Sequence, residues 1–95
     1  MKTFTLTAQI NTENPKAIKY ALKELLPKGF ITSTDNGFLV MATLKGKTAK
    51  DLNRTLLSAL RRVERKTVLR TKWKSGGKME RFFDYADKGL KKIDS

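Results

Sequence analysis

The sequence predicts an α+β domain in which two helices pack on one face of an antiparallel sheet. Three observations predict this fold class: apolar and polar residues alternate in two separate segments, apolar residues recur at helical spacing in two others, and Asn-Gly and Gly-Gly pairs mark tight turns. The expected order of elements is β-α-β-β-α-β-β, a two-layer sandwich. The 95 residues suffice for one domain, 1–95, and residues 89–95 are expected to be a frayed tail.

The first strand is expected at residues 3–10, TFTLTAQI, because its apolar side chains all fall on one side. A helix should follow, with Asn14 as its N-cap and Pro15 in its first turn. Pro27 and Gly29 end this helix. Its buried side is expected to consist of Ala17, Ile18, Ala21, Leu22 and Leu25.

Two further strands should flank a tight turn at Asn36-Gly37. The second of them, residues 38–44, is nearly continuous in apolar residues and is expected to be a central strand of the sheet. A second helix is then predicted from about Ala49 to Arg65, capped by Thr48. Its buried side is expected to consist of Leu52, Leu56, Ala59, Leu60 and Val63.

The last segment alternates again from residue 68 to 74, and Gly76-Gly77 predicts a two-residue hairpin turn. The returning strand then pairs Lys74 with Met79, Lys72 with Arg81, and Arg70 with Phe83. One face of this hairpin shows Arg70, Lys72, Lys74, Arg81, Phe83 and Tyr85, and the other shows Leu69, Trp73 and Phe82. A helix over residues 79–88 is the local alternative, and the aromatic residues favour the strand.

Positive charge is concentrated in one part of the chain. Residues 45–78 hold twelve of the 21 Lys and Arg residues and two acidic ones, a net +10 of the total +12. On the second predicted helix, Lys50, Arg54, Ser58, Arg61 and Arg65 share one arc, with Leu57 beside them. Solubility does not require such clustering, so we expect this segment to bind a polyanion.

The composition argues against catalysis and metal binding. The chain has no histidine and no cysteine, so it lacks the commonest general base and the commonest metal ligands. Glu80, Asp84 and Asp87 are close in sequence, but salt bridges to neighbouring cations explain them more simply than a metal site. We therefore expect that the protein is not an enzyme and that it binds no cofactor and no metal. The absence of cysteine and of an apolar run near the length of a membrane span predicts a cytoplasmic protein.

RNA is the expected partner, because exposed aromatic residues beside cations are typical of single-stranded RNA binding. The candidate contact residues lie on the second helix and on the last two strands. They are Lys50, Arg54, Arg61, Arg65, Arg70, Lys72, Lys74, Phe83 and Tyr85. The cations would neutralise phosphates and position the chain, and Phe83 and Tyr85 would stack on bases.

The segment LNRTLLSALR, residues 52–61, has the frame L-R-x-x-x-N-S-x-L-R at Leu52, Ser58, Leu60 and Arg61. Together with the order of elements over residues 4–63, it resembles the small dimerising subunit of the KEOPS complex, which makes threonylcarbamoyladenosine on tRNA. Asn53 and Leu57 depart from the frame, where Arg and Asn are usual. The resemblance implies a non-catalytic subunit that dimerises through its sheet and helps to hold tRNA.

Two other classes of partner remain open. The basic face could dock an acidic protein within a larger complex, and an exposed edge strand could support a homodimer. An anionic membrane surface is disfavoured, because the apolar side of the basic helix is needed for the core.

Overall fold

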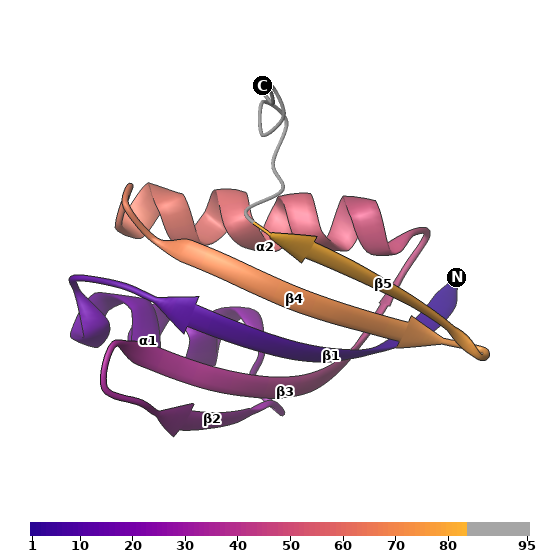
Figure 1. Ribbon diagram of the computed structural model, residues 1–95, viewed down its shortest axis with the longest axis horizontal. Coiled ribbons are helices and arrows are strands. Elements are labelled where there is room, and N and C mark those ends of the chain that lie inside the picture. The colour runs from indigo at the N-terminus through magenta and orange to yellow at the C-terminus, as the bar shows by residue number, and fades with distance from the viewer. Residues whose placement is uncertain (84–95) are drawn as a thin grey trace.

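The structure, a computed structural model that describes residues 1–83, contains one five-stranded antiparallel sheet and two helices (Figure 1). The strand order is β2-β3-β1-β4-β5, so β1 lies in the centre. The predicted fold class and order of elements are confirmed. The elements are β1 (Lys2–Asn11), α1 (Pro15–Leu25), β2 (Phe30–Ser33), β3 (Gly37–Gly46), α2 (Ala49–Val63), β4 (Val68–Ser75) and β5 (Lys78–Phe83).

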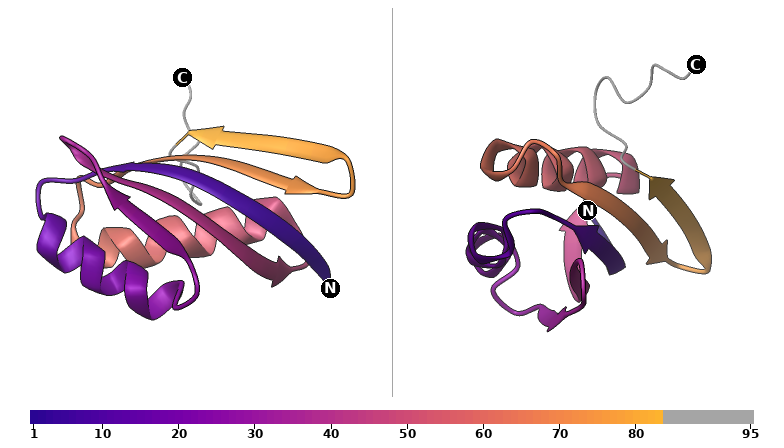
Figure 2. Two further views of the ribbon diagram at one scale, coloured as in Figure 1. Left: turned by 90° about the horizontal axis from the view of Figure 1, so that it is seen from below. Right: turned by 60° about the vertical axis from the view of Figure 1, so that its left-hand side comes forward.

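Both helices cover the same face of the sheet, side by side (Figure 2). None of the elements within residues 1–83 covers the opposite face, which we call the open face. Alternation in β1 sets this division, because every second side chain points to the helices. Phe4, Leu6, Ala8 and Ile10 are buried, whereas the residues between them are exposed. The hydrophobic core lies between the sheet and the two helices. Neither helix within residues 1–83 is long and apolar enough to span a membrane.

Helix α1 begins as the sequence predicts. The side-chain oxygen of Asn14 accepts a hydrogen bond from the backbone N–H of Ala17 at 3.5 Å. Ile18 and Leu22 are buried against the sheet. The end of the helix differs, because Leu26 is buried just after the last turn while Leu25 remains exposed. Leu26 thus takes the core position predicted for Leu25.

The β2–β3 turn lies one position earlier than the Asn36-Gly37 pair predicts. Ser33 pairs with Phe38, and the backbone N–H of Thr34 donates to the carbonyl of Gly37. Gly37 is therefore the first residue of β3 and pairs with Asn11 of β1. A Cβ at Gly37 would lie 1.9 Å from the carbonyl oxygen of Ile10, so glycine is required here by close backbone approach.

Helix α2 is capped by Thr48, whose hydroxyl oxygen accepts from the backbone N–H of Asp51 at 3.0 Å. The helix ends at Val63, so Arg65 lies in the connection to β4. The buried side is rotated from the predicted one. Leu57 is fully buried rather than beside the basic arc on the surface, and Val63 is exposed.

Asn53 explains the rotation of α2. Its side-chain oxygen accepts hydrogen bonds from the hydroxyl of Thr71 and from the indole Nε1–H of Trp73, the latter at 3.1 Å. All three side chains are buried. A buried indole N–H needs an acceptor, so Asn53 faces β4. Leu57 lies one helical turn after Asn53 on the same side of α2 and is therefore also buried.

The last hairpin has the predicted register. Gly76 and Gly77 form the turn with φ of 54° and 84°, a region that favours glycine. Lys74 pairs with Met79, Lys72 with Arg81, and Arg70 with Phe83. The strand interpretation is therefore confirmed through Phe83, and the segments expected at 84–88 and 89–95 lie outside the described residues.

Candidate nucleic-acid interface

Four cations lie together on the open face of the sheet. Alternation in β4 places Arg70, Lys72 and Lys74 on this face, because Leu69, Thr71 and Trp73 are buried on the other. On β5, Arg81 pairs with Lys72 and so lies beside it on the same face. Arg70, Lys72, Lys74 and Arg81 are all exposed, and we call them the cationic band.

No acidic side chain offsets this charge on the open face of the described strands. Glu80 is the one acidic residue within the five strands. It pairs with Trp73 and therefore lies on the side of the sheet that faces the helices. The like charges of the cationic band repel one another and gain most from a ligand that carries several negative charges.

Arg70 and Phe83 form a cation–π pair within this surface. The guanidinium carbon of Arg70 lies 4.7 Å from the centre of the Phe83 ring, and Phe83 itself is 62% exposed. The pair holds a planar cation and an aromatic ring at the surface of β4 and β5. Both groups stack on nucleic-acid bases in known modes of RNA recognition.

The open face changes in character from one strand to the next. Thr5, Thr7 and Gln9 of β1 pair with Lys74, Lys72 and Arg70, and we call these three the polar row. On the far side of β1 lie Leu39 and Met41 of β3 and Phe30 of β2, which we call the apolar strip. All three members of the apolar strip are exposed, at 46%, 55% and 76%.

Sequence reasoning missed several of these residues as site residues. The alternation in β1 predicts that its threonines and Gln9 point away from the core, but assigns them no partner. The predicted hairpin register already places Arg81 beside Lys72, which is the signal for its inclusion. Leu39 and Met41 belong to a continuous apolar run, so the sequence pattern does not distinguish them from core residues. Their position on the open face of the sheet shows that they reach solvent.

The cations of the second helix belong to the other layer of the molecule. Helix α2 packs on the face of the sheet opposite the cationic band, so the two groups do not form one continuous surface as the sequence suggested (Figure 2). Arg54 forms an ion pair with Asp51 at 2.9 Å. The Nε–H of Arg61 donates to the carbonyl of Thr67 at 3.1 Å and so fixes the connection to β4.

The other predicted site residues are placed as follows. Lys50 is exposed on α2, and Arg65 is exposed in the connection that follows it. Tyr85 lies outside the described residues. Within residues 1–83, no three acidic side chains come together in a way that could hold a metal ion.

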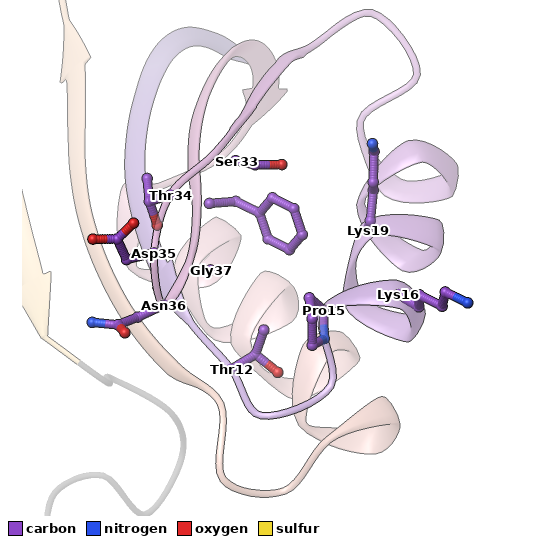
Figure 3. A pocket seen from close by; sticks show the side chains of 10 residues that line it. Thr12, Pro15, Lys16, Lys19, Ser33, Thr34, Asp35, Asn36 and Gly37 are labelled. Carbon is purple, nitrogen blue, oxygen red and sulfur yellow. The ribbon is translucent and has the colours of Figure 1, made fainter.

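A separate hollow of about 220 Å³ lies between the start of α1 and the β2–β3 turn (Figure 3). Lys16 and Lys19 line it, but Lys16 extends outward, away from Asp35 and Asn36 on the turn. The carboxylate of Asp35 at its rim opposes the binding of an anion. This hollow therefore lacks the uniform charge of the open face.

No family model matches the sequence, and no match was found among curated proteins or among solved structures. The geometry of the open face is therefore the basis for assigning a function.

Proposed function

We propose that the protein binds single-stranded RNA on the open face of its sheet and that it does so without catalysis. The observation that carries this proposal is the cationic band on β4 and β5, which no acidic side chain offsets on the open face of the described strands. Fixed cations along a strand suit a ligand with repeating phosphates. The cytoplasmic location and the absence of a cofactor stay predictions.

Single-stranded RNA fits this surface better than a duplex. A duplex on this sheet would meet it mainly through phosphates and riboses, and its bases would remain stacked inside the helix. The apolar strip would then have no partner in the complex. Unpaired bases can lie on this strip, where Phe30 offers an aromatic ring, and stacking of this kind contributes about 1–3 kcal/mol per base.

The cations of α2 and of the connection that follows it form a second group in this proposal. Lys50, Arg54, Arg61 and Arg65 would contact only an RNA long enough to reach both layers of the molecule. Short oligonucleotides should therefore depend on the cationic band alone. Long RNAs should depend on both groups.

Fluorescence anisotropy with labelled single-stranded RNA, tRNA and duplex DNA tests the proposal at low and near-physiological salt. The decisive variant is Arg70→Glu, Lys72→Glu. The matched control is Lys16→Glu, Lys19→Glu, which makes the same change in net charge on α1, on the helix-covered side of the sheet.

We expect the β4 variant to lose at least about tenfold in affinity for a short RNA, and the α1 control to lose much less. A Lys50→Glu, Arg65→Glu variant should lower the affinity for long RNAs and leave the affinity for short ones unchanged. Equal losses in the β4 and α1 variants would mean that net charge alone drives binding. Absence of binding at low salt would overturn the proposal.

A protein-interaction subunit is the second candidate function, and the exposed apolar strip favours it. Phe30, Leu39 and Met41 would suit a protein surface, and the cationic band would dock its acidic rim. A KEOPS-like dimerising subunit is one form of this candidate. Preference for tRNA over other RNAs and a concentration-dependent dimer in sedimentation experiments would support it.

A further inference from the structure

We propose that a single RNA strand lies along β4, with its phosphates on the cationic band, its riboses over the polar row and its bases over the apolar strip. This inference rests on the proposed function and adds two statements to it. It fixes the orientation of the ligand on the sheet. It also assigns recognition of the ribose 2′-hydroxyl to Thr5 and Thr7.

The order of side chains across the sheet matches the order of groups within a nucleotide. Cations lie on β4, uncharged hydrogen-bonding groups lie on the neighbouring β1, and apolar groups lie on the next strand, β3. Adjacent strands are about 4.8 Å apart, so the distance from β4 to β3 is roughly 10 Å. This is comparable with the reach of one nucleotide from its phosphate to its base.

Two registered rows make this arrangement specific. Lys72 pairs with Thr7, and Thr7 pairs with Met41. In the next row, Arg70 is aligned with Gln9 and Leu39. Each row therefore offers a cation, a hydrogen-bonding group and an apolar group in sequence, which suits one nucleotide per row.

The spacing along β4 suits an extended strand. Arg70, Lys72 and Lys74 are two residues apart, so their Cα atoms are separated by about 6.8 Å in a straight row. An extended single strand can follow such a row, whereas a strand of a wound duplex turns away from it. The ligand is therefore expected to be single-stranded over at least the length of the cationic band.

A hollow lies where the three groups of side chains meet. It has a volume of about 210 Å³ and is open to solvent on the uncovered face of the sheet. Six open-face residues line it: Thr7, Gln9, Leu39, Arg70, Lys72 and Arg81. A ribose placed here would have cations on one side and an apolar surface on the other.

The polar row has the chemistry to distinguish RNA from DNA. A threonine hydroxyl can donate to or accept from a ribose 2′-hydroxyl, and the side-chain amide of Gln9 can do both. The 2′-hydroxyl is the group by which a protein distinguishes RNA from DNA at a given site. Thr5, Thr7 and Gln9 are exposed, so they can reach such a group.

The test compares labelled eight-nucleotide oligouridine with the corresponding oligodeoxyuridine, which has the same bases and lacks the 2′-hydroxyls. Wild-type protein should prefer the RNA. The Thr5→Val, Thr7→Val variant removes two hydroxyls and keeps the branched shape that favours strands. We expect its affinity for the RNA to fall about ten- to a hundredfold, with affinity for the DNA unchanged, because each of the two lost hydrogen bonds contributes about three- to tenfold.

The matched control is Thr55→Val on α2, which removes an exposed hydroxyl from the other layer and should leave the RNA-to-DNA ratio unchanged. Wild-type protein with 2′-O-methyl oligouridine provides a measurement that needs no variant, and binding should weaken. An unchanged ratio in the β1 variant, together with undiminished binding of the 2′-O-methyl RNA, would overturn the inference.

Different results refute the proposed function and the proposed orientation of the RNA. If wild-type protein prefers RNA and only the Arg70→Glu, Lys72→Glu variant weakens binding, the proposed function stands and the orientation is wrong. If wild-type protein binds neither oligonucleotide at low salt, both are wrong.

Discussion

Replacement of Asn53 by alanine should destabilise the fold by about 2–4 kcal/mol. The side-chain oxygen of Asn53 is the acceptor for two buried donors, the hydroxyl of Thr71 and the indole N–H of Trp73. A buried donor that loses its acceptor costs about 1–3 kcal/mol. The hydroxyl can rotate toward another acceptor, whereas the indole N–H is fixed in the plane of its ring. Most of the cost therefore comes from Trp73, and the volume left by the amide adds to it.

This loss is a large share of the roughly 5–15 kcal/mol by which a domain of this kind is stable. It corresponds to a fall in melting temperature of roughly 10–25 °C for a chain of this size. Urea unfolding followed by far-ultraviolet circular dichroism measures the free energy directly. Thr55→Ala, at an exposed position on the same helix, is the control and should change stability by less than about 0.5 kcal/mol.

A double-mutant cycle with Trp73→Phe isolates the hydrogen bond, because phenylalanine has no N–H to satisfy. Asn53→Ala should cost about 1–2 kcal/mol less in the Trp73→Phe background than in the wild-type background. An equal cost in both backgrounds would refute the assignment of the stabilisation to the hydrogen bond between Asn53 and Trp73. A total cost below about 0.5 kcal/mol would refute the role of Asn53 altogether.

Two glycines and one lysine allow the backbone geometry and the charge of the sheet to be tested separately. Gly37→Ala should lower stability by roughly 1–3 kcal/mol in urea unfolding, because its Cβ would meet the carbonyl oxygen of Ile10; an unchanged midpoint would show that the turn can shift. Gly77→Ala should cost about 1–2 kcal/mol, because its φ of 84° is unfavourable for alanine, and a stabilised variant would contradict this. Lys72→Met should reduce the salt dependence of binding to single-stranded RNA by about 0.7 in the slope of log affinity against log salt, whereas Lys19→Met should leave the slope unchanged.

The elements with strong local patterns were predictable from the sequence. Alternation together with the Gly76-Gly77 pair predicts the register of the last hairpin, and that register places Arg81 and Phe83 beside the β4 cations. The predicted β2–β3 turn lies one residue too late in the chain. Glycine is required at position 37 by its close approach to the backbone of Ile10 in β1, and not by the turn. A contact between segments this far apart in the chain leaves no local pattern.

The extent of the candidate site was predictable only in part. The cations of α2 and β4 are close in sequence and suggest one basic surface, but the short connection after α2 carries the chain from the helix layer to the sheet. Strand alternation then turns Arg70, Lys72 and Lys74 to the opposite side of the molecule. The buried Asn53 rotates α2 by hydrogen bonds to β4, which helical periodicity of apolar residues cannot foresee.

The central place of β1 in the sheet has a consequence for how the chain folds during synthesis. β1 is complete at Asn11, yet one of its two neighbours, β4, begins only at Val68. At about 5–20 residues per second, a ribosome needs roughly 3–12 s between these two points. During that interval β1 can pair with β3 while its other edge stays unpaired, and the two donors that β4 contributes to Asn53, Thr71 and Trp73, have not yet been synthesised. We expect a nascent chain arrested after α2 to expose this edge to chaperones and to other chains, and completion of β4 to close it.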